Sequence, residues 1–110
     1  MSSSIPSKIF SPDLLNGRVT LVTGGGSNLG RAAATELAAC GATVVIAGRR
    51  EEVLADACDR IGPSASFVPG DIRRDEDAEL IVRTCLERHG RLDVLVNNAG
   101  GQYFVPAESI

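Results

Sequence analysis

The sequence contains no tryptophan, and its 110 residues include one tyrosine, one lysine and one histidine: Tyr103, Lys8 and His89. The three cysteines are widely spaced and form no CxxC pair, which excludes a disulfide framework and the common zinc-binding patterns. The net charge is -3 and the arginines are scattered, so nothing in the charge pattern attracts nucleic acid or an anionic membrane. These absences favour a protein that acts on a small molecule, with no metal site, nucleic acid or membrane as a partner.

Long apolar segments are absent as well. No apolar run approaches the roughly 20 residues that would span a bilayer, and the N-terminal segment lacks the apolar stretch of a secretory signal. The cysteines are therefore interpreted as buried thiols in a reducing compartment, and we expect a cytoplasmic protein. With 44% hydrophobic and 23% charged residues, the chain has the composition of one globular domain.

Strand and helix patterns alternate along the chain after an N-terminal arm, residues 1–17, which shows no sustained period. Short apolar runs that end near glycine or proline predict buried strands. Apolar residues at a spacing of three and four predict helices between them. The predicted strands are 18–23, 42–47, 66–69 and 92–97, and the predicted helices are 29–40, 51–61 and 75–89.

This alternation predicts an α/β fold of the Rossmann type, a doubly wound parallel sheet in a three-layer α/β/α arrangement. Residues 18–110 would form its nucleotide-binding domain and contain the first four strands only. Residues 98–110 show no clear period, so the fourth strand is expected to lie at an unpaired edge of the sheet.

A glycine-rich segment, TGGGSNLG, joins the first predicted strand to the first predicted helix. Glycines allow a tight turn and a close approach of the backbone to a pyrophosphate, and the helix N-terminus attracts negative charge. The strand before it and the helix after it make a dinucleotide site the favoured interpretation, with a turn that binds nothing as the alternative. A P-loop is disfavoured because Arg31 follows Gly30 where that motif needs lysine.

The end of the second predicted strand indicates which dinucleotide is bound. NAD-preferring Rossmann folds place an acidic residue there to bind the ribose hydroxyls, whereas this chain has Gly48, Arg49 and Arg50 before Glu51. Guanidinium groups suit a 2′-phosphate. We therefore expect NADP(H) to be preferred and NAD(H) to be a weaker cofactor; the alternative is a pair of solvated arginines that opens a helix.

Three motifs in order, TGGGSNLG, then Gly70-Asp71-Ile72, then Asn97-Asn98-Ala99-Gly100, resemble the short-chain dehydrogenase/reductase family. The resemblance covers roughly residues 15–105. It implies that Gly24, Ser27, Leu29 and Gly30 line the cofactor phosphates and ribose, that Asp71 and Ile72 flank the adenine, and that Asn98, Ala99 and Gly100 lie along the cofactor.

Each of these roles has a structural alternative. Asp71 could be a turn or helix-entry aspartate, and Asn97 and Asn98 could cap a strand end. Asn28 departs from the family pattern, which has glycine there. If the position requires positive φ, asparagine is one of the few residues that tolerates it, and its side chain could add a hydrogen bond. Asn28 is therefore kept in the predicted binding loop.

The family's reaction uses a tyrosine and a lysine four residues apart, in which the lysine makes the tyrosine a better acid–base group. Ala107 stands four residues after Tyr103, and Lys8 is in the arm. By that pattern the chain holds no catalytic residue, and the domain stops before the catalytic half.

The function predicted is therefore the NADP(H)-binding portion of an NAD(P)-dependent oxidoreductase. The run Gly100-Gly101-Gln102 makes the chain similar to peroxisomal-type enoyl-CoA reductases and to bacterial citronellol/citronellal dehydrogenases. That similarity implies a carbonyl, alcohol or enoyl-CoA substrate of lipid-like character and a homo-oligomeric full-length parent. The alternative is a non-catalytic NAD(P)-binding sensor or interaction module.

Overall fold

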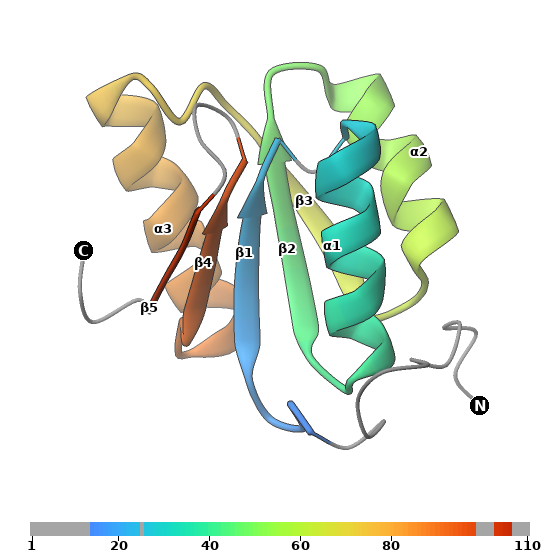
Figure 1. Cartoon of the computed structure of the whole chain (residues 1–110). Coiled ribbons are helices and arrows are strands. Elements are labelled where there is room, and N and C mark those ends of the chain that lie inside the picture. The colour runs from blue at the N-terminus through green and yellow to red at the C-terminus, as the bar shows by residue number, and fades with distance from the viewer. Residues whose placement is uncertain (1–13, 25, 99–102, 107–110) are drawn as a thin grey trace.

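A computed structural model describes residues 14–24, 26–98 and 103–106, the last of these in the backbone only. One mixed sheet has the strand order β3-β2-β1-β4-β5 (Figure 1). The strands are β1 (Val19–Thr23), β2 (Thr43–Gly48), β3 (Ala65–Pro69), β4 (Val94–Asn97) and β5 (Tyr103–Pro106). The helices are α1 (Asn28–Ala39), α2 (Glu51–Ile61) and α3 (Asp75–His89).

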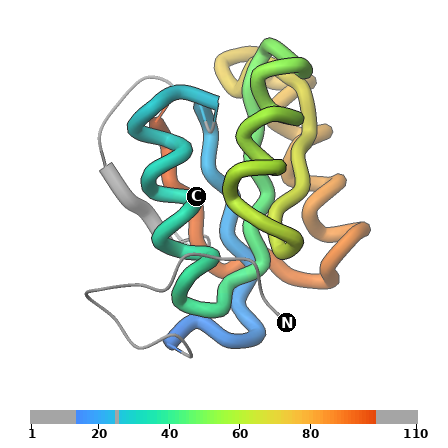
Figure 2. The backbone as a smooth tube through the Cα atoms, turned by 90° about the vertical axis from the view of Figure 1, so that its right-hand side faces the viewer, coloured from blue at the N-terminus to red at the C-terminus, as the bar shows by residue number. Residues whose placement is uncertain are grey.

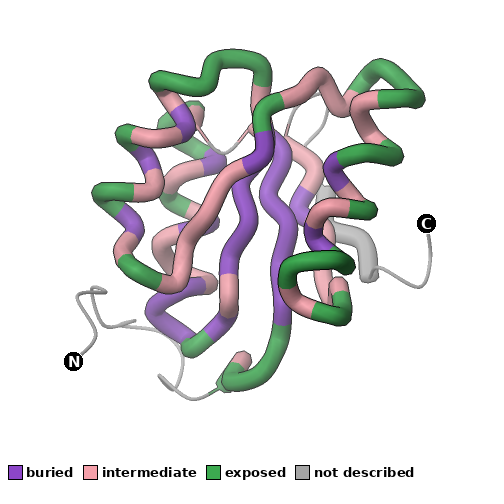
Figure 3. Tube along the Cα trace, turned by 180° about the vertical axis from the view of Figure 1, so that it is seen from behind, coloured by how far each residue is buried: buried purple, intermediate pink, exposed green. Residues whose placement is uncertain are grey.

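The two central strands carry the core because helices cover them on both faces. Side chains on alternate positions of β1 and β2 point to opposite faces: Val22, Val44 and Ile46 pack against α1 and α2, whereas Leu21 and Val45 pack against α3. Figure 2 shows α1 in teal and α3 in orange on opposite sides of the strands. The buried residues follow these strands through the centre of Figure 3. The predicted three-layer arrangement is confirmed.

The four parallel strands and three helices lie where the sequence predicts them, within about two residues at each end. The small-residue face of α1 allows close packing, and Ala34 and Ala38 are buried there. In α3, Ile81 and Cys85 are fully buried, whereas Leu86 is 46% exposed. Cys58 is half-buried and Cys40 is buried, so two of the three thiols lie in the core.

The edge of the sheet differs from the prediction. The fourth strand is not unpaired, because β5 runs antiparallel beside it, in the register Val94 with Pro106 through Asn97 with Tyr103. The sheet therefore has four parallel strands and one antiparallel strand, rather than four strands alone. A four-residue strand that contains proline gives a weak sequence signal, which is why residues 98–110 show no period.

The last residues of the predicted arm belong to the body of the domain. Residues 14–17 form a turn in which Leu15 packs against the core beneath α1 and α2. The Leu15 N–H also donates to the Cys40 carbonyl at 2.8 Å. The folded unit thus begins at or before Leu14, and the rest of the predicted arm lies outside the described residues.

Both edges of the sheet carry groups that limit further pairing. At the β3 edge, Nη1 of Arg88 donates to the Phe67 carbonyl at 3.1 Å and to Ser66 Oγ at 3.3 Å. Pro69 ends β3, and Pro106 ends β5. Proline has no backbone N–H to offer a neighbouring strand.

Asp93 joins the starts of β1 and β4. Its Oδ2 accepts the Val19 N–H at 2.8 Å, and its carboxylate also binds the guanidinium of Arg91 and, at 3.5 Å, that of Arg18. The Asp93 side chain is 15% exposed. The Arg91 hydrogen bonds, followed by the Val19 hydrogen bond, hold the pKa of Asp93 below its ordinary 3.8.

We expect Asp93→Ala to lower the free energy of unfolding by about 1–3 kcal/mol, because it leaves the Val19 N–H without its charged acceptor. Since folding lowers the pKa, this contribution is present above pH 3.8 and is lost as the pH falls through the folded value. Urea unfolding at pH 7 and pH 3 measures both effects. Asp56→Ala, which removes an exposed pair with Arg60, is the control and should change stability by less than about 0.5 kcal/mol. Equal losses in the two variants at pH 7 would contradict the role given to Asp93.

Candidate functional site

A cleft of about 410 Å³ opens at the carboxyl ends of β1, β2 and β3. In open α/β sheets this is where ligands bind, and the volume suits a small molecule. Loops from four strands contribute to its walls. The lining residues are Gly24, Gly26, Ser27, Ala47, Gly48, Arg49, Arg50, Val53, Leu54, Gly70, Asp71, Ile72, Arg73 and Asn98.

Ser27 organises the glycine-rich loop. It is the N-cap of α1: its Oγ accepts the Gly30 N–H at 3.1 Å and donates to the Gly24 carbonyl at 2.7 Å. Its backbone N–H donates to the same carbonyl at 3.0 Å. These bonds fold the loop back on itself and fix the start of α1, whose first-turn N–H groups and positive dipole end suit an anion.

The loop is also fastened to two neighbouring strands. The Gly24 N–H donates to the Ala47 carbonyl of β2 at 2.8 Å. On the other side, Nδ2 of Asn98 donates to Ser27 Oγ at 2.9 Å, and the Asn98 N–H donates to Thr23 Oγ1 at 3.0 Å. Asn98 therefore does cap the end of β4, as the structural alternative held, and it lines the cleft at the same time.

Two glycines in this loop are needed for different reasons. Gly24 has φ of +68°, and a Cβ there would lie 3.4 Å from Asn98. Gly26 has no positive φ, but a Cβ on it would lie 2.5 Å from Cγ1 of Val53 in α2. Val53 is β-branched and has little rotamer freedom to move away. Gly26 thus lets α2 approach the loop closely.

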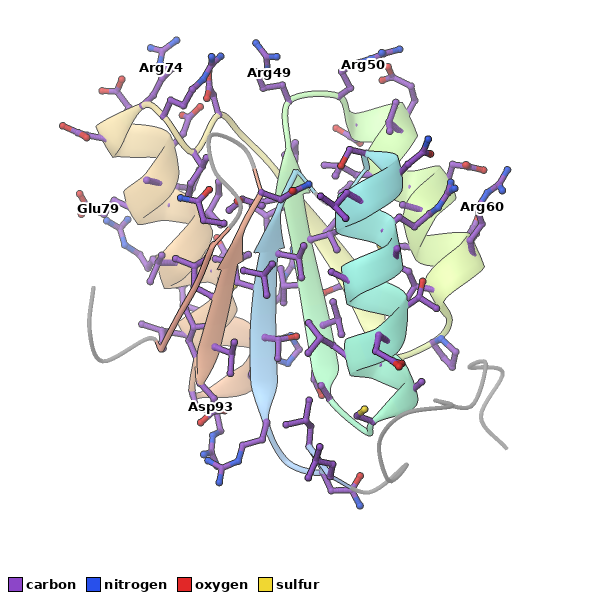
Figure 4. All side chains as sticks on the ribbon, viewed as in Figure 1. Arg49, Arg50, Arg60, Arg74, Glu79 and Asp93 are labelled. Atoms are coloured by element: carbon purple, nitrogen blue, oxygen red, sulfur yellow. The ribbon has the colours of Figure 1, made fainter. Side chains whose placement is uncertain are left out.

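Two arginines follow the end of β2. Arg49 is exposed at the rim of the cleft, and Arg50 precedes α2, where its Nε donates to Glu52 Oε1 at 3.3 Å. Figure 4 shows both at the same end of the molecule, above the loops. Among the described lining residues Asp71 is the one carboxylate, so the β2 end carries the positive charge that the sequence predicts.

Asp71 follows β3 and is held by Arg73. Nε and Nη2 of Arg73 donate to Oδ1 and Oδ2 of Asp71 at 3.0 and 3.1 Å, and the Arg73 backbone N–H adds a third bond to Oδ1. These hydrogen bonds, with a smaller contribution from the charge of Arg49, lower the pKa of Asp71 to about 2. The carboxyl group is therefore ionised at neutral pH.

The cleft brings together seven of the twelve predicted site residues: Gly24, Ser27, Arg49, Arg50, Asp71, Ile72 and Asn98. Asn28, Leu29 and Gly30 lie in the first turn of α1 and do not line it; Leu29 is 56% exposed and Gly30 is buried. Ala99 and Gly100 lie outside the described residues. The prediction missed Gly26, Val53 and Arg73, which also line the cleft.

Asn28 does not occupy a strained position. It is the first residue of α1, and no described residue other than glycine has positive φ. Position 28 therefore does not require positive φ, which is the condition under which asparagine is expected to take the place of glycine. Its Oδ1 does accept a hydrogen bond, at the long distance of 3.5 Å from Nη2 of Arg31.

We expect Asn28→Gly to leave NADPH and NADH affinity within about twofold of the wild type, because the side chain is exposed and does not line the cleft. Thermal unfolding should show a small loss, no more than about 1 kcal/mol, from glycine in a helix. Fluorescence titration with each cofactor measures the first effect. A tenfold loss of affinity would show that the Asn28 amide contacts the ligand.

Two other kinds of site receive no support from the part of the chain that the structure describes. It contains no group of three or more histidine, cysteine, aspartate or glutamate side chains placed to hold a metal ion. None of its helices has the length and apolar character required to cross a membrane.

A parallel α/β sheet with a glycine-rich loop at the N-terminus of its first helix, and a cleft beside that loop, defines a dinucleotide-binding fold. The chain belongs to the short chain dehydrogenase family, whose profile matches residues 18–110. This is a family of NAD(P)-dependent oxidoreductases with a Rossmann-type domain, as the sequence predicts. The comparisons give no support to a non-catalytic role.

Relatives and solved structures agree with this assignment. The chain is 39% identical over 104 residues to the peroxisomal 2,4-dienoyl-CoA reductase of Arabidopsis thaliana, covering 92% of this chain and 35% of that protein. It is 43% identical to a citronellol catabolism dehydrogenase of Pseudomonas aeruginosa, with a TM-score of 0.81 over 96% of this chain and 44% of that one. Both groups named from the sequence are therefore among its relatives.

A third comparison concerns the cofactor. The chain is 36% identical to 3-ketoacyl-(acyl-carrier-protein) reductase of Brucella melitensis, solved as a complex with NADH. The TM-score is 0.70, over 74% of this chain and 34% of that one. The chain spans about a third of the length of the curated relatives it matches.

Proposed function

We propose that this chain is the NADP(H)-binding portion of a short-chain dehydrogenase and that it binds NADPH more tightly than NADH. The observation that carries the proposal is Arg49 at the rim of the cleft, at the end of β2, where an NAD-preferring fold has a carboxylate. A guanidinium group attracts the 2′-phosphate of NADP(H) and forms paired hydrogen bonds to it.

The residues present fit the rest of the dinucleotide. Gly24 and Gly26 leave the backbone of the loop open to close approach, and Ser27 fixes the start of α1, which suits the pyrophosphate. Asp71 and Ile72 on the far wall would flank the adenine. The Brucella melitensis relative is a complex with NADH, so the fold alone does not select NADP(H), and the selection rests on residues such as Arg49.

For the whole protein we propose transfer of a hydride between NADP(H) and a carbonyl, alcohol or enoyl-thioester substrate. When bound, NADPH would supply the hydride to a carbonyl or enoyl group, which would also take up one proton; with an alcohol, NADP+ would accept the hydride and the alcohol would lose one proton. The names of the Arabidopsis thaliana and Pseudomonas aeruginosa relatives, a dienoyl-CoA reductase and a citronellol catabolism dehydrogenase, support a lipid-like substrate. The part that this chain plays is to hold the cofactor. A cytoplasmic location and a homo-oligomeric parent stay predictions.

Titration of the 110-residue chain with NADPH and NADH, followed by cofactor fluorescence, tests the preference. We expect NADPH to bind about tenfold more tightly, because a hydrogen bond to a charged group contributes roughly 1.5–3 kcal/mol. Arg49→Ala should lose most of this preference by weakening NADPH and should leave NADH within about twofold. Arg60→Ala, which alters an exposed arginine outside the cleft, should change neither affinity.

Two results would contradict the proposal. Equal affinity for the two cofactors in the wild-type chain would remove the basis for an NADP(H) preference. A loss of NADH binding in Arg49→Ala as large as the loss of NADPH binding would mean that Arg49 supports the cleft rather than the 2′-phosphate.

A further inference from the structure

Arg73 is a charged residue of the cleft to which the family resemblance assigns no role. It is 62% exposed, yet its guanidinium is fixed by two parallel hydrogen bonds to the Asp71 carboxylate. This fork geometry is the strongest arrangement of an arginine with a carboxylate. The backbone of Asp71 is also fixed, because its N–H donates to Oδ2 of Asp77 in α3 at 2.9 Å. The loop after β3 therefore presents Asp71 in one orientation.

The charge of Asp71 matters for a phosphorylated cofactor. Asp71 and Arg49 line the same cleft, and Arg49 is close enough to contribute to the lowered pKa of Asp71. A 2′-phosphate bound at Arg49 carries between one and two negative charges at neutral pH. An unpaired carboxylate beside it would repel it and would compete for Arg49.

Among the described residues, no other arginine is placed to pair with the Asp71 carboxylate as Arg73 does. Arg50 pairs with Glu52, and Arg74 pairs with Glu76; Arg74 does not line the cleft. The Asp77 carboxylate beneath the loop adds further negative charge. Arg73 is thus the cation that neutralises Asp71 directly.

We propose that Arg73 is a positioning residue that makes the cleft selective for a 2′-phosphorylated cofactor by neutralising Asp71 and keeping its carboxylate away from Arg49. The inference rests on the proposed NADP(H) function. It differs from a direct role, because Arg73 acts through Asp71 and its effect disappears when Asp71 carries no charge.

The experiment measures dissociation constants of NADPH and NADH for the 110-residue chain and its variants. Arg73→Gln should reduce the NADH-to-NADPH ratio of dissociation constants by about fivefold or more and should change NADH affinity by less than about threefold. Arg73→Lys keeps the charge without the fork and should retain more than half of the ratio. Arg74→Gln is the matched control, and its ratio should equal that of the wild type.

A second background separates action through Asp71 from direct contact with the phosphate. In Asp71→Asn, adding Arg73→Gln should change the ratio by less than about twofold, because no carboxylate remains to be neutralised. The Arg73 side chain is 62% exposed and the Asp71 side chain 20%, and circular dichroism of each variant verifies that it is folded. Isothermal titration with 2′-AMP and 5′-AMP gives the same comparison without the nicotinamide half.

Three outcomes would overturn the inference: an unchanged ratio in Arg73→Gln, an equal drop in the Asp71→Asn background, or a drop in Arg73→Lys as large as in Arg73→Gln. The first would leave the NADP(H) preference standing with Arg49 alone. The second would make Arg73 a direct phosphate ligand. A wild-type chain that does not prefer NADPH would instead contradict the proposed function, which the Arg49→Ala series detects separately.

Discussion

Gly26→Ala should destabilise the domain by about 1–3 kcal/mol and weaken NADPH binding by about tenfold or more. The added methyl group would lie 2.5 Å from Cγ1 of Val53, so the loop or α2 must shift. A shift of the loop moves the backbone that faces the pyrophosphate. Thermal unfolding and NADPH titration measure the two effects on the same protein.

Val53→Ala in the same chain provides the decisive comparison. It removes the methyl group with which the new Cβ collides, so the double variant should recover at least half of the affinity that Gly26→Ala loses. Val53→Ala alone should lower the free energy of unfolding less than Gly26→Ala does, because the Val53 side chain is only partly buried. If the double variant is as weak as Gly26→Ala, the collision is not the cause, and Gly26 is required for contact with the ligand itself.

Gly30→Val should reduce NADPH affinity by on the order of 100-fold. Gly30 is buried in the first turn of α1, where its N–H donates to Ser27 Oγ. A β-branched side chain at this point would push α1 away from the sheet and break the cap that shapes the loop. Isothermal titration measures the affinity, and circular dichroism verifies that the variant remains folded.

Ala32→Val is the control for that experiment. It places the same β-branched residue in the same helix, but at an exposed position. The variant therefore has the lower helix propensity of valine but does not disturb the packing of α1 on the sheet. Its NADPH affinity should stay within about twofold of the wild type. A folded Gly30→Val variant that binds as tightly as Ala32→Val would show that the packing of α1 on the sheet does not determine phosphate binding.

The order and type of the main elements follow from local patterns, and this is why the sequence predicts them well. The run from Val19 to Thr23 is apolar and β-branched, and the small residues of α1 repeat with a helical period. Both signals lie within short windows. The pairing of β4 with β5 depends instead on which partner is available at the edge of a sheet, and no short window of sequence carries that information.

The site shows the same division. The glycine loop and Arg49 can be recognised from sequence because each directly follows a predicted strand, β1 or β2, where a Rossmann fold binds its dinucleotide. The need for glycine at position 26 arises from Val53, which lies 27 residues later in α2. The ion pair of Asp71 with Arg73 could have been found, since two residues of opposite charge at a spacing of two in a loop are a visible signal.

The proline and arginine residues at the two outer strands bear on how this chain behaves at high concentration. A strand from another molecule that approached β3 would meet the Phe67 carbonyl already bound by Arg88. One that approached β5 would find no backbone N–H at Pro106. Since unpaired strand edges are the usual templates for intermolecular association, these groups work against edge-to-edge pairing of the sheet with a second molecule.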